Sequence, residues 1–225
     1  MGKNLNLGIS PITSNLFLSS VFATNIASLD KYEIDNIVSI LSYDTNKPEI
    51  YQSIENKYDL ISSSSSSSRN SNKKKDQSSP KPKKPANTKP KPITVTTPQF
   101  TTFKNRPRML YSSIPDIPGT ADIIKDIIPD CIKYIHNHRI NDNQKVLVHC
   151  VAGKSRSASI IIAYLMTITN TDLDKVFKKL TSKREVNPNR GYMAMLRNLD
   201  VSGIQRELGL TGEDFQRECI EFYSS

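Results

Sequence analysis

Apolar residues along this chain follow two different periods. Short apolar runs typical of buried strands occupy residues 16–18, 36–41, 109–114 and 145–148. Apolar residues at helical spacing, or helix-forming runs, occupy residues 124–135, 158–166, 193–199 and 213–223. Buried strands interleaved with helices predict an α/β layer fold, with a central mixed, mostly parallel sheet flanked by helices.

One further helix is indicated by its ends. Thr171-Asp172-Leu173-Asp174 has the form of a capping box, in which Thr171 would cap the helix. Basic residues gather toward the other end of this helix, where the macrodipole favours cations. They are Lys178, Lys179, Lys183 and Arg184.

The pattern is interrupted between residues 46 and 106. Seven consecutive serines (62–68) are followed by a segment rich in Lys and Pro. Such a segment has little apolar surface to bury and many like charges, so it cannot offset the entropy lost on ordering. We therefore expect a disordered Ser/Lys/Pro-rich insertion at 46–106 within a domain spanning 10–205, followed by a C-terminal helical extension at 206–225.

The formal net charge of +9 is distributed unevenly. Residues 62–108 contain twelve Lys and Arg residues and a single acid, Asp76, so this segment carries +11 and the remainder carries −2. The basic character therefore belongs to the insertion, whose lysine clusters suit acidic surfaces or nuclear import factors. We expect no specific nucleic-acid binding by the folded part.

Cysteine usage and hydropathy bear on the compartment. The chain has three cysteines and no C-x-x-C pair, which argues against disulfides and a zinc site and favours a reducing environment. No apolar stretch reaches 18 residues, and the N-terminus lacks the apolar core of a signal peptide. We expect a cytoplasmic or nuclear location, without a transmembrane segment.

Residues 149–157, His-Cys-Val-Ala-Gly-Lys-Ser-Arg-Ser, carry the clearest chemical signal. A strand, a tight loop and a helix in this order form a phosphate cradle, because loop N–H groups converge and the helix N-terminus adds partial positive charge. Cys150 at the start of the loop would be stabilised as a thiolate. Arg156 can hold two phosphoryl oxygens at once, and Gly153 suits a turn with positive φ. These features predict phosphoryl transfer to sulfur.

This segment resembles the signature loop of the cysteine-based protein phosphatases, and the run 149–159 is most similar to the dual-specificity phosphatases. Residues 12–20, 34–41 and 184–193 also resemble segments of that family. The resemblance covers about 10–43 and 109–200. It implies a cysteine-phosphatase fold of the compact, atypical type. It also implies hydrolysis of phosphotyrosine and phosphoserine or phosphothreonine in proteins, without a metal or another cofactor.

The resemblance assigns a role to each residue of the loop. Cys150 would attack phosphorus, Ser157 would stabilise its thiolate when it leaves, and His149 would orient the loop and help to keep Cys150 ionised. The phosphoryl oxygens would be held by the Arg156 side chain and by backbone N–H groups. These N–H groups belong to Val151, Ala152, Gly153, Lys154, Ser155 and Arg156.

A leaving alkoxide or phenolate must be protonated, and the family supplies an aspartate about thirty residues before the cysteine. Asp116 lies 34 residues before Cys150, directly after a predicted strand and between two prolines. Asp122 lies 28 residues before it, in the first turn of a predicted helix, where an acid serves the helix dipole. We therefore expect Asp116 to be the general acid.

Two other functions remain open. Lys154 occupies a position where dual-specificity phosphatases often carry an apolar residue and phosphoinositide phosphatases place a lysine. A phosphoinositide or other non-protein phosphatase using the same loop is therefore one alternative. The other is an inactive phospho-binding module, although such proteins usually lose the cysteine, the arginine or the acid, and all three are present here.

Overall fold

In a computed structural model of the protein, the described residues are 8–42, 99–101 and 108–224. Their strands form one six-stranded sheet in the order β1-β2-β6-β3-β5-β4. The strands are β1 (Ser10–Pro11), β2 (Leu16–Ser20), β3 (Asn36–Leu41), β4 (Gln99–Thr101), β5 (Arg108–Ser113) and β6 (Val146–Cys150). The four inner strands are parallel, and β1 and β4 pair antiparallel at the two edges. The predicted mixed, mostly parallel sheet is confirmed.

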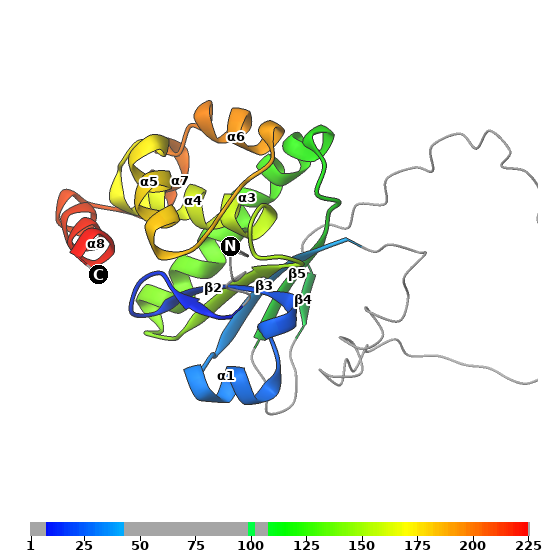
Figure 1. Ribbon diagram of the computed structural model, residues 1–225. Helices are drawn as coiled ribbons and strands as arrows, with labels where there is room; N and C mark the ends of the chain where they lie inside the picture. Colours follow the sequence, from blue (N-terminus) through cyan, green and yellow to red (C-terminus); the bar gives the residue numbers. More distant parts are fainter. Residues whose placement is uncertain (1–7, 43–98, 102–107, 225) are drawn as a thin grey trace, which may run out of the picture.

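Helices cover both faces of this sheet (Figure 1). On one face lies α1 (Ile26–Tyr32). The larger layer on the other face consists of α3 (Ala121–His136), α4 (Arg156–Thr169), α5 (Leu173–Lys183), α6 (Arg190–Arg197), α7 (Ser202–Glu207) and α8 (Gly212–Ser224). Short helical turns lie at Val21–Ala23, Pro118–Thr120 and Asn137–Asn141.

The inner strands carry mostly apolar residues in their buried middle parts because both faces of the sheet are covered. Every residue of β2, β3 and β6 is buried. Alternate residues belong to two separate cores, as the pleat requires. Leu18 and Val148 join the larger core under α3 and α4, whereas Phe17 and Leu147 join a smaller core with Leu29 of α1.

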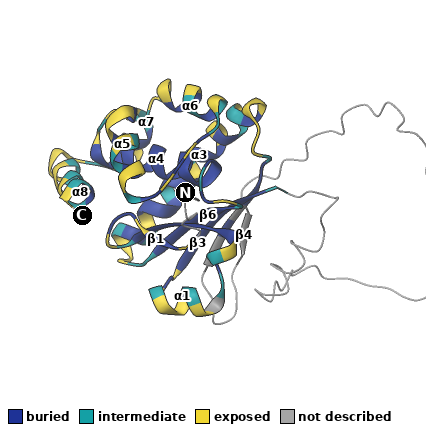
Figure 2. Cartoon of the chain, in the orientation of Figure 1, coloured by how far each residue is buried: buried dark blue, intermediate teal, exposed yellow. Residues whose placement is uncertain are grey.

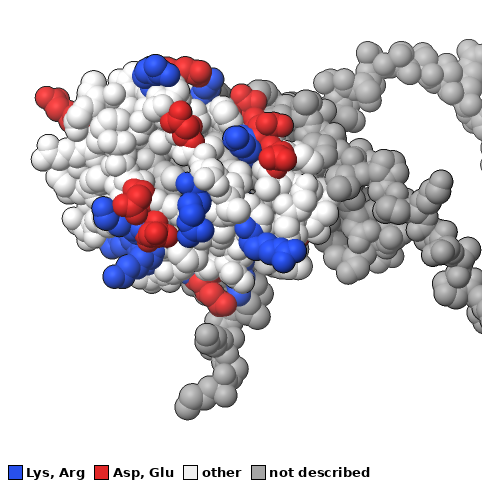
Figure 3. Space-filling model, turned by 90° about the horizontal axis from the view of Figure 1, so that it is seen from above, with Lys and Arg blue, Asp and Glu red and all other residues white. Residues whose placement is uncertain are grey.

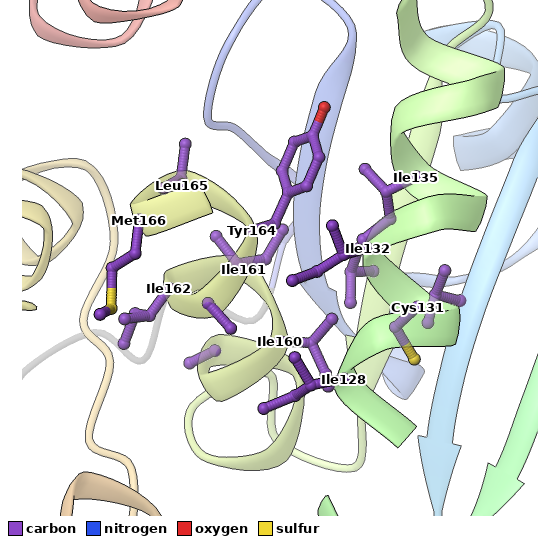
Figure 4. Close-up of a cluster of buried hydrophobic side chains, with 14 of the residues drawn as sticks. Ile128, Cys131, Ile132, Ile135, Ile160, Ile161, Ile162, Tyr164, Leu165 and Met166 are labelled. Atoms are coloured by element: carbon purple, nitrogen blue, oxygen red, sulfur yellow. The ribbon is translucent and has the colours of Figure 1, made fainter. Parts of the chain in front are cut away.

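Helix α4 is the centre of the larger layer. All of its residues are buried, so it is surrounded by the sheet and by neighbouring helices (Figure 2). Figure 4 shows its isoleucines packed against those of α3, among them Ile128, Ile132 and Ile160. A helix buried on all sides holds its N-terminus in a fixed place. That N-terminus is where the loop after Cys150 ends.

Two sequence predictions are corrected by the structure. Gln99–Thr101 were assigned to the insertion but form β4, paired with Met109–Tyr111 of β5. The Ser/Lys/Pro composition does not extend to these residues, and their neighbourhood is rich in Thr and Phe, which favour strands. The rest of the predicted insertion, 46–98 and 102–106, lies outside the described residues. The cap of α5 is Asp172, whose side chain accepts from the Lys175 N–H, rather than Thr171.

On the face seen from above, basic and acidic side chains are intermixed (Figure 3). Within the described ranges, no helix combines the length and the apolar composition needed to cross a bilayer.

A buried ion pair joins α8 to the rest of the domain. Arg139 Nη1 donates to Glu218 Oε2 at 2.5 Å, and the two side chains are 2% and 3% exposed. Arg139 also donates to Thr13 and pairs with Glu221, whose Oε1 accepts from the Ser14 N–H and hydroxyl. This network connects α8 to the turn between β1 and β2. Phe222 of α8 is fully buried in the larger core.

Glu218→Gln should destabilise the protein, because it removes one of the two carboxylates that pair with the buried Arg139. Breaking a buried pair costs about 3–5 kcal/mol. Chemical denaturation of the variant should show a loss near the lower end of this range, because Glu221 remains. Glu207→Gln is the matched control, since Glu207 pairs with Lys133 at an exposed position and such pairs contribute about 0–1 kcal/mol. Equal losses in the two variants would contradict the assignment.

Candidate active site

The loop after β6 lies at the carboxyl end of the parallel strands, which is where open α/β sheets bind ligands. Cys150 is the last residue of β6, and Arg156 is the first residue of α4. Residues 151–155 form the turn between them. The predicted sequence of strand, loop and helix is therefore confirmed.

The sulfur of Cys150 receives two hydrogen bonds. The Gly153 N–H donates to Sγ at 3.3 Å, and the Ser157 hydroxyl donates to it at 3.1 Å. Cys150 is 1% exposed and lies next to the N-terminus of α4, which adds partial positive charge. Two hydrogen-bond donors and the positive end of a helix therefore converge on one sulfur atom.

Gly153 is required by the shape of the turn. Its φ is +69°, in the left-handed region, and a Cβ at this position would lie 2.4 Å from the Ser19 carbonyl oxygen and 2.7 Å from Arg184 Nη2. Any other residue would displace the loop from β2. The Val21 N–H also donates to the Val151 carbonyl, at 3.2 Å. The segment after β2 therefore fixes the first half of the loop.

Several backbone donors of the loop are free to bind an anion. Within the described part of the chain, the N–H groups of Ala152, Lys154, Ser155 and Arg156 donate to no protein acceptor. The Arg156 side chain is buried, and its Nη1 donates to the Ile114 carbonyl at 2.8 Å. That bond fixes one end of the guanidinium against the segment after β5. The geometry fits a tetrahedral oxyanion.

Asp116 is brought directly to this loop. It follows β5, and its Oδ1 accepts from the Ser155 hydroxyl at 2.7 Å and from Asn189 Nδ2 at 2.9 Å. Its Oδ2 lies 3.6 Å from Arg156 Nε, and the side chain is 31% exposed. Asp122 lies in the first turn of α3. Of the two candidate acids, it is Asp116 that contacts the loop.

Lys154 also lies at the loop, but its charge is compensated. Its Nζ is 3.0 Å from Glu185 Oε1, and its side chain is 22% exposed. The Lys154 carbonyl accepts from the Asn187 N–H at 2.8 Å. The second half of the loop is thus tied to the segment that precedes α6.

His149, the residue before Cys150, is buried. It is 1% exposed, and burial lowers its pKa to about 4, although a hydrogen bond with the Cys150 backbone raises it. The imidazole is therefore neutral near neutral pH and supplies no positive charge to Cys150. The predicted roles of His149, orienting the loop and helping to keep Cys150 ionised, stay predictions, and any such effect would come from the neutral imidazole.

Arg184 and Asn189 belong to the site, but no role was predicted for either. Arg184 was interpreted as a cation at the end of α5. It is instead buried, and its Nε donates to the Gly153 carbonyl at 3.2 Å, while its Nη1 donates to Gly8 and Ser10 near β1. Burial lowers the pKa of Arg184, and charge on Cys150 raises it. The only sequence signal was the resemblance of 184–193 to a family segment.

Low pH should destabilise the protein through His149. Its pKa is about 4 in the fold and 6.5 ordinarily, so between these values the unfolded chain binds more protons. The stabilisation from the neutral imidazole is complete above pH 6.5 and is lost as pH falls toward 4, to a total of about 3 kcal/mol. Urea denaturation at several pH values should therefore show a shallower pH dependence in His149→Gln. An unchanged dependence would contradict this assignment.

Comparisons with known proteins agree with this geometry. A family model described as "Dual specificity phosphatase, catalytic domain" matches residues 78–201. The mouse (Mus musculus) protein named dual specificity protein phosphatase 15 is 35% identical over 100 residues, which are 44% of this chain and 40% of that protein. The chain thus spans about two fifths of the length of this curated relative.

Solved structures share the fold. The crystal structure of DUSP15 has a TM-score of 0.58 at 22% identity, covering 90% of this chain and 96% of that one. The human tyrosine phosphatase-like serine/threonine/tyrosine-interacting protein has a TM-score of 0.55 at 23% identity, covering 85% and 94%. The family model covers more than half of the sequence. The chain belongs to the dual specificity phosphatase family.

Proposed function

We propose that this protein hydrolyses phosphotyrosine and phosphoserine or phosphothreonine in proteins through a cysteinyl-phosphate intermediate. The observation that carries this proposal is the meeting of three groups at one loop. Cys150 lies at its start with two donors on its sulfur, Arg156 lies at its end, and Asp116 accepts a hydrogen bond from Ser155 between them. They supply a nucleophile, an anion hole and an acid.

In the first step, the Cys150 thiolate attacks phosphorus and the bond to the substrate oxygen breaks. Asp116 gives its proton to that oxygen, so the alcohol or phenol leaves neutral. The Arg156 side chain and the free N–H groups of the loop hold the other three phosphoryl oxygens. The product is a phosphoryl group bound to sulfur.

In the second step, the Asp116 carboxylate takes a proton from water, which attacks phosphorus. The sulfur–phosphorus bond breaks and inorganic phosphate leaves. Cys150 returns as a thiolate, and the Ser157 hydroxyl already donates to its sulfur at 3.1 Å. A hydrogen bond that stabilises the departing thiolate favours this step.

The pairing of Lys154 favours protein substrates over phosphoinositides. A phosphoinositide carries several phosphates, and a lysine at the rim would attract them only if its charge were available. Glu185 lies 3.0 Å from Lys154 Nζ and compensates that charge. A non-protein phosphatase that uses the same loop is the second candidate function. The relative rates of phosphate release from a phosphopeptide and from a phosphoinositide distinguish it from a protein phosphatase.

The fold does not by itself decide between an enzyme and a binding module. One structural neighbour is named a phosphatase-like interacting protein. Catalysis is supported by the presence of Cys150, Arg156 and Asp116 at one loop. We propose phosphorylated proteins as substrates and a cytoplasmic or nuclear location. The basic insertion would contact acidic surfaces or import factors.

Purified protein should release phosphate from a peptide that carries both phosphothreonine and phosphotyrosine, faster than from a soluble phosphoinositide. Cys150→Ser is the matched control, because it replaces the thiol by a hydroxyl of similar size and so removes the thiolate, and it should abolish release. Phosphate release and the loss of each modified residue by mass spectrometry are the readouts. Release from the phosphoinositide alone would overturn the substrate class, and no Cys150-dependent release from either would overturn the activity.

A further inference from the structure

Asn189 connects the acid, the phosphate loop and helix α6. Its Nδ2 donates to Asp116 Oδ1 at 2.9 Å, and its backbone N–H donates to the Ser155 hydroxyl at 3.1 Å. Its Oδ1 caps α6 by accepting from the Tyr192 N–H at 3.0 Å. Both ends of the side-chain amide are therefore used, one in the helix cap and one on the acid.

The helix that carries Asn189 is packed tightly against the segment that carries Asp116. The hydroxyl of the buried Tyr192 donates to the Pro115 carbonyl at 3.0 Å and lies 2.7 Å from the Thr120 hydroxyl. A Cβ on Gly191 would lie 2.4 Å from the Pro118 carbonyl oxygen, so only glycine permits this approach. The start of α6 and residues 115–118 thus have a fixed separation, which sets the distance from Asn189 to the acid.

The two donors reach the same oxygen of Asp116. Oδ1 accepts from Ser155 and from Asn189, whereas Oδ2 faces Arg156 Nε at 3.6 Å. Because Oδ1 already accepts two hydrogen bonds, its lone pairs are occupied, and it is less able than Oδ2 to carry a proton. The proton to be transferred therefore belongs on Oδ2, the oxygen on the side of the arginine that would hold the phosphoryl group.

We propose that Asn189 is a positioning residue for the general acid, which it orients so that Oδ2 presents the proton to the leaving oxygen. This inference rests on the proposed phosphatase function. Asn189 acts through Asp116 and does not touch the reacting atoms. Its contribution should therefore be largest where the leaving group most needs a proton, because a serine alkoxide is a far poorer leaving group than a nitrophenolate.

The test is Asn189→Ser. Serine still caps α6 but is too short to reach Asp116. For a phosphoserine peptide, kcat should fall about tenfold with KM unchanged, which corresponds to about 1.4 kcal/mol. For p-nitrophenyl phosphate, the fall should be much smaller. The ratio of the two rates in one preparation does not depend on the folded fraction, and Asn189→Gly, which also caps a helix, gives a second measurement.

The matched control is Asn25→Ser. Asn25 caps α1 on the other face of the sheet by accepting from the Ser28 N–H at 3.0 Å, so the same cap substitution made away from the loop should leave the rate ratio unaltered. A double variant gives a further readout. In an Asp116→Asn background, Asn189→Ser should have no additional effect on kcat, because its role passes through the acid.

The failure of this inference and the failure of the proposed function are distinguishable. If the unmodified protein shows no Cys150-dependent hydrolysis of p-nitrophenyl phosphate, the proposed function fails. If it is active but Asn189→Ser has the same rate ratio as the unmodified protein, or if its effect persists in full without Asp116, the positioning role alone is refuted.

Discussion

The tight turn between β6 and α4 determines how the sheet, the central helix and the phosphate loop fit together. In five residues the chain leaves a buried central strand and enters a helix that is buried on all sides. The turn is possible only because Gly153 has a positive φ and lies against the Ser19 carbonyl. In this tight turn, the Gly153 N–H points at the Cys150 sulfur, and four other N–H groups of the loop have no acceptor within the described part of the protein. The backbone geometry that closes the fold also forms the anion site.

Segments far apart in the sequence hold this turn in place. Val21 follows β2, Asp116 follows β5 and Arg184 follows α5, and each contacts a different part of the loop. Arg184 extends the connection to the region of β1 through Gly8 and Ser10. Because these contacts come from packed elements, the groups of the site are preorganised before a phosphate arrives, which is where much of the stabilisation of developing charge arises.

Features that depend on local sequence could be predicted. The short apolar runs indicated the positions of the inner strands, because a strand covered on both faces is rich in apolar residues. The spacing from Cys150 to Arg156, and Asp116 framed by prolines after a strand, identified the residues that meet at the loop. The edge strand β4 could not be predicted, since three residues carry too little pattern to distinguish them from the adjoining polar segment.

Features that depend on long-range packing could not be predicted. Nothing in the local sequence shows that Arg184 turns inward to Gly153, or that Asn189 reaches an aspartate 73 residues earlier. The neutral state of His149 likewise follows from its burial rather than from its neighbours in the chain. In each case, the partner or the environment is set by the tertiary fold, and spacing along the sequence carries no information about it.

If Cys150 is the nucleophile, it becomes phosphorylated during turnover, and the phosphorylated protein can be trapped. The Asp116→Asn variant should be mixed with p-nitrophenyl phosphate, whose nitrophenolate leaves without protonation by a general acid. The reaction should be stopped with acid after a short time. Without the carboxylate the second step is slow, so a phosphoryl group should accumulate on the peptide that contains Cys150, as read by mass spectrometry. Release of nitrophenol with no adduct, or an adduct on another residue, would contradict the account.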